Sequence, residues 1–192
     1  MDASRPFNIL AISGSLRAAS LNSMLLRAAK RLAPPAIEFE LYRGLADLPL
    51  FNPDLEAHGA PPAVAELRAQ IIASDAVLIA SPEYAHGVSG VIKNALDWMV
   101  GNESFVDKAV GVLNASRRAT IAQAALRETL ATMSAHVVPA ACITVPILGS
   151  GLDEDGIVLH DEISSALVGA LRALQRASHA KLRGAASDQS NG

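Results

Sequence analysis

The chain alternates short apolar runs with segments of helical periodicity along almost its whole length. Residues 7–12, 76–80 and 109–113 are nearly continuous apolar runs, a pattern typical of strands that are buried on both faces of a parallel sheet. Between them lie segments in which apolar residues recur every three or four positions, as on one face of a helix. Because strands and helices alternate without a break in composition, the pattern predicts one doubly wound α/β domain.

The same periodicities predict five strands and the helices that connect them. Residues 37–42 alternate apolar side chains with Glu38 and Glu40, which indicates an edge strand with one solvated face. Pro139 interrupts the fifth strand, and a polar loop at 149–156 precedes the last helix. The expected strands are 7–12, 37–42, 76–80, 109–113 and 137–145, and the expected helices are 22–32, 63–73, 91–100, 120–133 and 161–182.

The length and composition indicate a single globular domain. The 192 residues are 51% hydrophobic and 18% charged, which is enough apolar material for one sizeable core and too much for a disordered chain. We therefore expect one domain over residues 1–192, in which the polar segment 184–192 forms a disordered tail.

The charge and cysteine content exclude several classes of partner. A net charge of −3 provides no basic stripe for nucleic acid, and no apolar run approaches the ~18 residues that span a bilayer. The N-terminus lacks the basic and apolar regions of a secretory signal, and the single cysteine, Cys142, cannot form an intrachain disulfide. We therefore expect a cytoplasmic protein with no nucleic-acid or membrane partner, in which Cys142 is a small buried hydrophobe.

The loop after the first expected strand, Ser13-Gly14-Ser15-Leu16-Arg17, has the chemistry of an anion site. It leads into a helix, whose free N-terminal amides favour negative charge. The hydroxyls of Ser15 and Ser20, the amide of Asn22 and the guanidinium of Arg17 suit a phosphate monoester. The spacing matches neither GxxxxGK[ST] nor GxGxxG, so we expect no triphosphate or dinucleotide cradle. The alternative is a plain turn in which Ser20 caps the helix and Arg17 is solvated.

The loop after the third expected strand, Ser81-Pro82-Glu83-Tyr84-Ala85-His86-Gly87, is suited to a flat ring. Its amides from Glu83 to His86 are available to a planar ring with carbonyl and imide groups, and Tyr84 offers an apolar surface beside them. His86 faces a substrate or makes a hydrogen bond within the loop. Trp98, further along, is expected to pack in the core. The five histidines have no ligand spacing, so we expect no metal site.

These two loops are expected to form one site. In an open parallel sheet, ligands bind outside the carboxyl ends of the strands, at the point where the winding direction reverses. The first and third strands flank that point when the second strand lies at the sheet edge.

Together the motifs resemble those of the NAD(P)H-dependent FMN reductase family, which includes quinone, chromate and azo-dye reductases. The resemblance extends over roughly residues 7–180 and is carried by Gly14–Arg17, Ser20 and Asn22, then by Pro82–Tyr84 and Lys93–Trp98. It implies a flavodoxin-like fold, with a five-stranded parallel sheet of order 2-1-3-4-5 in a three-layer α/β/α arrangement.

The resemblance also implies how a cofactor is bound. It assigns the FMN phosphate to the first loop and the isoalloxazine ring to the second, largely through backbone groups, with Ser116 approaching from the loop after the fourth strand. No side chain is expected to be catalytic, because the flavin carries the chemistry. The implied cofactor-binding residues are Ser15, Leu16, Arg17, Ser20, Asn22, Pro82, Glu83, Tyr84, Ala85 and Ser116.

The implied activity is transfer of a hydride from NADPH or NADH to bound FMN, and from there to a quinone, free flavin or similar small-molecule acceptor. The resemblance further implies a dimer or tetramer. One alternative is a flavodoxin-type one-electron carrier, although such carriers are more acidic than this chain. A serine hydrolase is disfavoured because no GxSxG motif is present, and a flavin-free regulatory α/β protein is the third alternative.

Arg117 and Arg118 follow the fourth expected strand. Since arginine pairs well with phosphate, this pair is able to attract the 2′-phosphate of NADPH. The alternative is a solvated pair at the start of a helix.

Overall fold

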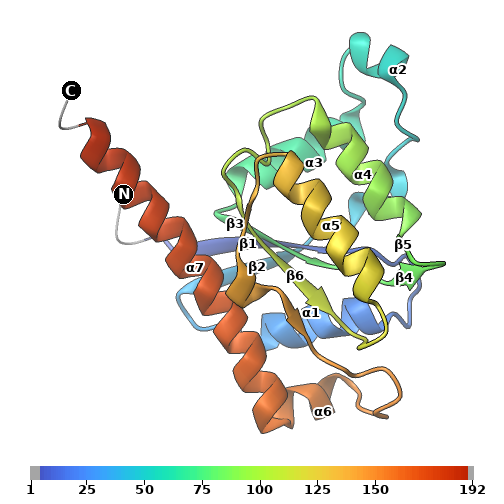
Figure 1. Ribbon diagram of the computed structural model, residues 1–192, viewed down its shortest axis with the longest axis vertical. Coiled ribbons are helices and arrows are strands. Elements are labelled where there is room, and N and C mark those ends of the chain that lie inside the picture. The colour runs from blue at the N-terminus through green and yellow to red at the C-terminus, as the bar shows by residue number, and fades with distance from the viewer. Residues whose placement is uncertain (1–4, 190–192) are drawn as a thin grey trace.

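The computed structural model describes residues 5–189, with side chains as far as residue 180, and has a parallel sheet at its centre (Figure 1). The sheet order is β2-β1-β3-β6-β7, with β8 also beside β6, and every pair in it is parallel. This confirms the flavodoxin-like order expected for the main strands. The strands are β1 Phe7–Ser13, β2 Ile37–Leu41, β3 Ala76–Ala80, β6 Ala109–Asn114, β7 His136–Val137 and β8 Ile143–Thr144.

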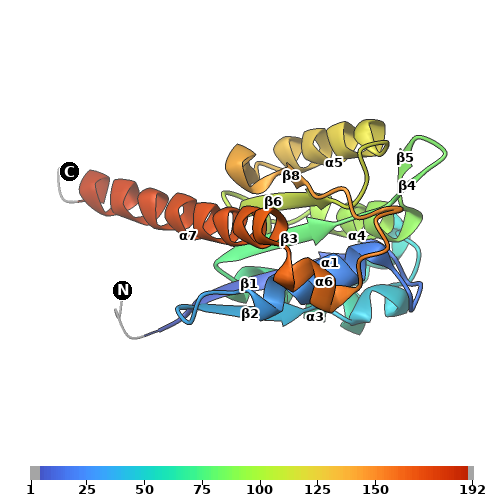
Figure 2. The same cartoon turned by 90° about the horizontal axis from the view of Figure 1, so that it is seen from below.

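Helices cover both faces of the sheet, which completes the expected three layers (Figures 1 and 2). Alternate side chains of β1 enter two separate cores. Ile9 packs with α1, α6 and α7, whereas Leu10 packs with α3, α4 and α5. The helices are α1 Leu21–Arg31, α2 Pro53–Ala57, α3 Pro62–Ala73, α4 Gly90–Val100, α5 Thr120–Thr132, α6 Glu154–Leu159 and α7 Asp161–Gln189.

The apolar segments of the sequence form the buried central strands. All residues of β3 and β6 are buried, and they pair in register from Ala76 opposite Ala109 to Ala80 opposite Leu113. The other long elements begin and end within two residues of their expected bounds, except for the fifth strand and the last helix.

The fifth strand, expected over 137–145, is broken into two short pieces. Pro139 has no N–H to donate to a ladder, and it begins a 3-10 turn, η2 Pro139–Ala141, between β7 and β8. This turn lies against the centre of β6, where a Cβ on Gly111 would lie 2.9 Å from the carbonyl oxygen of Ala141. Gly111 therefore allows the interrupted strand to approach the sheet.

The C-terminal segment differs from the expected tail. Helix α7 continues to Gln189, beyond the expected end at residue 182, so the segment 184–192 is helical as far as residue 189. Residues 190–192 lie outside the described residues. The expected loop 149–156 also ends earlier, because Asp153 caps α6 by accepting a hydrogen bond of 2.8 Å from the amide of Gly156.

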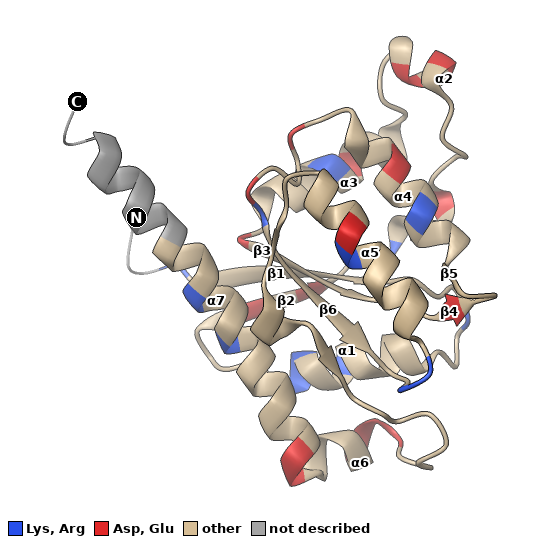
Figure 3. Ribbon diagram, in the orientation of Figure 1, with Lys and Arg blue, Asp and Glu red and all other residues tan. Residues whose placement is uncertain are grey.

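Short elements that the sequence pattern did not predict complete the fold. A 3-10 turn, η1 Gly44–Asp47, follows β2, and a two-stranded hairpin, β4 Glu83–Tyr84 and β5 Gly87–Val88, follows β3. Acidic and basic residues are interleaved over the helices and loops (Figure 3). In the described part of the chain, no helix is long and apolar enough to cross a membrane.

Trp98 packs in the core, as expected. It is fully buried, its ring lies edge-on to Phe51 at 5.1 Å, and its Nε1 donates a 2.8 Å hydrogen bond to the carbonyl oxygen of Pro49. Asn94 donates to the same oxygen at 3.0 Å. Two residues of the Lys93–Trp98 segment therefore support the 49–51 loop. Cys142 is only partly buried, and this burial raises the pKa of its thiol.

Gly111→Ala is expected to destabilise the protein, because the added methyl group would overlap η2 and Leu78. Overpacking of this kind costs about 1–3 kcal/mol. Gly169→Ala is the matched control: Gly169 is helical and exposed, with nothing within 4 Å of an added Cβ, and should stabilise by about 0.5–1 kcal/mol. Urea unfolding midpoints measure both effects. An unchanged midpoint for Gly111→Ala would contradict the close approach.

Candidate functional site

The loops that follow β1 and β3 are in direct contact at Gly14. The amide of Gly14 donates a 2.8 Å hydrogen bond to the carbonyl oxygen of Ala80. A Cβ on Gly14 would lie 2.5 Å from Ser81 Oγ and 2.7 Å from Ile92 Cγ1, distances that real Cβ atoms do not reach. Glycine at this position therefore allows the two loops to form one continuous wall.

A cavity of about 350 Å³ lies at the carboxyl ends of β1, β3 and β6. Eight of the ten residues implied by the resemblance line it: Ser15, Arg17, Ser20, Asn22, Pro82, Glu83, Tyr84 and Ser116. The remaining lining residues are Ala19, Leu21, Ser81, Asn114, Ala115, Arg118, Ala119 and Leu148.

Leu16 and Ala85 do not line this cavity. Leu16 is 58% exposed. Ala85 and His86 form the turn of the β4–β5 hairpin, both with positive φ, 49° and 61°. The cofactor-binding roles of Leu16 and Ala85 stay predictions.

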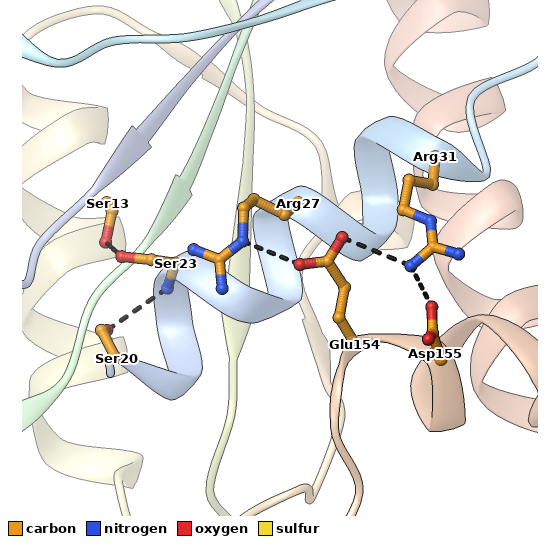
Figure 4. A network of polar contacts seen from close by, with 7 residues as sticks. All are labelled: Ser13, Ser20, Ser23, Arg27, Arg31, Glu154 and Asp155. Carbon is orange, nitrogen blue, oxygen red and sulfur yellow. Dashed lines mark hydrogen bonds and ion pairs between the residues drawn. The ribbon is translucent and has the colours of Figure 1, made fainter. Parts of the chain in front are cut away.

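The start of α1 opens onto the cavity. Ser20 is the N-cap of α1, and its Oγ accepts a 3.3 Å hydrogen bond from the amide of Ser23 (Figure 4). Ser23 Oγ lies 2.7 Å from Ser13 Oγ, which ties the helix start to the end of β1. The amides of Leu21 and Asn22, in the first turn, have no partner within the helix. Ser20 thus caps the helix, as one alternative expects, and it also lines the cavity; its binding of a phosphate stays a prediction.

The Asn22 side chain provides an independent sign that a ligand belongs here. Asn22 is buried, it lines the cavity, and its Oδ1 has no hydrogen-bond partner among the described residues. A buried polar atom without a partner is costly. A ligand hydroxyl would satisfy this oxygen, or an anion would satisfy the amide nitrogen after rotation of the carboxamide.

Two arginines reach the cavity without an ion pair among the described residues. Arg17 and Arg118 both line it and are exposed, whereas Arg117 does not line it. Each guanidinium offers several donors in a fork that fits phosphate. Together with the start of α1, the two arginines make the cavity favourable to an anion.

Glu83 acts through its side chain, a role that the sequence did not predict. Its Oε2 accepts a 2.8 Å hydrogen bond from the amide of Ala122, in the first turn of α5, and its Oε1 lies 3.1 Å from His86 Nδ1. The hydrogen bond from Ala122, with a further contribution from His86, lowers the pKa of Glu83. The α5 N-cap residue, Ala119, has no capping side chain, so Glu83 caps this helix from the hairpin. His86 is thus a partner within the loop.

Asn114 shapes the third loop, and sequence analysis missed it. It is buried, its Oδ1 accepts from the amide of Ser116 at 2.9 Å, and its Nδ2 donates to the carbonyl oxygen of Ala119 at 3.0 Å. The signal that could have identified Asn114 is its position, as a polar residue at the end of an apolar strand. Leu148, from the loop after β8, had no comparable signal.

Ion pairs connect α1 to α6 on the far side of the helix from the sheet (Figure 4). Arg27 Nε lies 2.8 Å from Glu154 Oε2, and Arg31 contacts both Glu154 and Asp155. These groups are partly exposed, so each pair contributes little stability. They nevertheless fix the start of α6, and with it the end of the loop that carries Leu148.

The fold is flavodoxin-like, with a cavity at the carboxyl ends of its central strands. Residues 7–147 match the family model described as NADPH-dependent FMN reductase, and the chain belongs to this family. An NAD(P)H-dependent FMN reductase of Pseudomonas aeruginosa strain PAO1 is 39% identical over 172 residues, 87% of this chain and 92% of that protein. A quinone reductase of Escherichia coli K12 is 37% identical over 97 residues, 50% of this chain and 52% of that protein.

A solved structure supports the same assignment. The flavoenzyme NAD(P)H:(acceptor) oxidoreductase FerB of Paracoccus denitrificans matches with a TM-score of 0.71 and 31% identity, over 90% of this chain and 97% of that one. The expected family, fold and enzyme class, an FMN-dependent NAD(P)H oxidoreductase, are therefore confirmed.

Asn22→Ala is expected to weaken FMN binding about tenfold, which corresponds to about 1.4 kcal/mol, with little loss of apoprotein stability. The reason is that the variant removes a buried oxygen that lacks a partner. Ser20→Ala is the contrasting variant. It should destabilise the apoprotein, because loss of the α1 N-cap costs about 1 kcal/mol of stability. Chemical unfolding of the apoproteins and FMN titration separate the two effects. A large stability loss with unchanged FMN affinity for Asn22→Ala would contradict the assignment.

Glu83→Ala is expected to lower the unfolding midpoint at pH 7, because it removes the α5 cap. Since the folded pKa lies below the ordinary value of 4.5, this stabilisation is complete above pH 4.5 and is lost as the pH falls through the folded pKa. The difference from the unsubstituted protein should therefore narrow in acid. Glu128→Ala, on the exposed face of α5, is the control for removal of a carboxylate from this helix and should leave the unfolding midpoint at pH 7 nearly unchanged.

Proposed function

We propose that the cavity binds FMN and that the protein uses it to pass electrons from NAD(P)H to a quinone, free flavin or a similar small-molecule acceptor. The observation that carries this proposal is the convergence of the α1 N-terminus, Arg17 and the unpartnered Asn22 oxygen in one cavity. The names of the curated relatives support quinones as one class of acceptor.

The residues of the first loop would hold the phosphate. Ser15 and Ser20 supply hydroxyl donors, Arg17 supplies a charged fork, and the first-turn amides of α1 supply the positive end of a helix dipole. Charge-assisted contacts of this type contribute about 1.5–3 kcal/mol each. Asn22 would bind at the junction between the phosphate and the rest of the ligand.

The hairpin and the third loop would position the ring. Glu83 holds the β4–β5 hairpin against α5, so that the backbone after Pro82 forms one side of the cavity. Tyr84 is 60% exposed at the cavity and offers an aromatic surface to a second substrate. Ser116, from the loop after β6, would approach the ring as well. Bound FMN supplies the two-electron chemistry, and the chain supplies binding, orientation and shielding from water.

We also propose that the protein is cytoplasmic and self-associates into a dimer or tetramer. A single partly buried cysteine suits a reducing compartment. Exposed apolar side chains near the cavity support self-association: Tyr84 and Leu148 line it, and Ile121 lies in the first turn of α5 beside Glu83. Such patches commonly mark interfaces.

Arg17→Ala is expected to weaken FMN binding about ten- to hundredfold, as the loss of one charged contact predicts. The measurement is an FMN titration of the apoprotein, followed by steady-state oxidation of NADPH and NADH with a quinone. Arg43→Ala removes an exposed arginine that does not line the cavity and is the control. An unchanged dissociation constant would refute the role of the first loop. If a chemical reductant reduces the bound flavin but the protein does not oxidise NAD(P)H, the one-electron carrier would be favoured.

A further inference from the structure

A second cavity adjoins the proposed FMN cavity. It has a volume of about 430 Å³ and is lined by Ser116, Arg117, Arg118, Pro146, Leu148 and Gly149. Ser116, Arg118 and Leu148 also line the first cavity. The two cavities therefore share a wall that these three residues form.

The walls of the second cavity are held in place by backbone contacts. The loops after β6 and β8 are joined where Val145 N donates to Asn114 O at 2.7 Å and Leu148 N donates to Ala115 O at 3.2 Å. On the arginine side, the amide of Arg118 donates to Ser116 Oγ at 3.1 Å. The arginines thus extend from an ordered loop rather than from a free segment.

The charge of this cavity is positive and unbalanced. Arg117 and Arg118 line it, no carboxylate does, and neither guanidinium forms an ion pair with a described residue. The carboxylate of the adjoining cavity, Glu83, is already engaged by Ala122 and His86. In Figure 3 the loop between β6 and α5 is a basic segment. A cavity of this kind favours an anionic ligand, such as one that carries a phosphate group.

We propose that the second cavity binds the adenosine 2′-phosphate of NADPH and that Arg117 determines the preference for NADPH over NADH. The inference rests on the proposed function, because a nicotinamide dinucleotide must reach the FMN cavity. NADPH and NADH differ only in this phosphate. Arg117 lines the second cavity alone, whereas Arg118 stands at the boundary, beside the part of the ligand that both dinucleotides share.

Binding without turnover is the first test. Isothermal titration calorimetry of the FMN-loaded protein compares the affinities for adenosine 2′,5′-bisphosphate and for 5′-AMP. The difference between them is the contribution of the 2′-phosphate to binding. We expect the bisphosphate to bind more tightly, and Arg117→Ala to remove most of that advantage. Arg172 is an exposed arginine on α7 that does not line the cavity. Arg172→Ala removes the same charge and should leave the difference in affinity between the two ligands unchanged.

Steady-state kinetics with a quinone acceptor is the second test. Arg117→Ala is expected to raise the KM for NADPH about tenfold, the effect of one lost phosphate contact, and the KM for NADH less than twofold. Arg117→Lys keeps the positive charge but loses the bidentate geometry of the guanidinium. Its KM for NADPH should therefore lie between those of the unsubstituted protein and of Arg117→Ala. Arg118→Ala should raise both KM values by similar factors. Raising the salt concentration should reduce the preference for NADPH, since exposed charges are screened.

The outcomes separate this inference from the proposed function. If the FMN-loaded protein oxidises neither dinucleotide, the proposed function fails. If it turns over but Arg117→Ala leaves the ratio of the two KM values and the affinity for the bisphosphate within twofold, the 2′-phosphate subsite is refuted. Equal binding of the bisphosphate and 5′-AMP to the unsubstituted protein would refute it as well.

Discussion

The site depends on the contact between Gly14 and Ser81. Only a hydrogen atom fits on Gly14 at this point, because Ser81 Oγ and Ile92 Cγ1 occupy the space of a Cβ. The hydrogen bond from Gly14 N to Ala80 O continues the parallel ladder of β1 and β3 one residue past the strand end. A loop suited to phosphate and a loop suited to a ring therefore leave the sheet side by side and face one cavity.

The N-termini of α1 and α5 both lie at this edge of the sheet, and they differ in how their first-turn amides are bonded. The first turn of α1 keeps amides free beside Arg17 and Asn22, so that end attracts an anion. The first turn of α5 is capped by the Glu83 carboxylate, a negative charge that offsets its dipole. The helix terminus that attracts an anion in the proposed FMN cavity is thus that of α1. The terminus of α5 holds the hairpin, and the positive charge on the α5 side comes from Arg117 and Arg118.

Much of the fold could be predicted because its signals are local. The apolar runs of β1, β3 and β6 identify strands buried on both faces, and the resemblance to a known family implied their order, which the structure confirms. The interruption of the fifth strand at Pro139 was expected, but its extent was not, because the 3-10 turn that replaces the middle of the strand packs on Gly111 in another strand. Eight site residues came together because they follow strand ends that meet at one edge.

The remaining features of the site depend on contacts that no local pattern encodes. Glu83 and Ala122 are 39 positions apart, and nothing in the sequence near Glu83 indicates that its carboxylate caps a later helix. The same holds for the turn at Ala85 and His86, where two residues other than glycine have positive φ. A left-handed conformation costs about 1–2 kcal/mol per residue, and type I′ turns normally use Asn-Gly for this reason. The contacts of Glu83 with α5 and with His86 hold the hairpin in this conformation, so the backbone beside the proposed ring site is positioned by tertiary structure rather than by its own sequence.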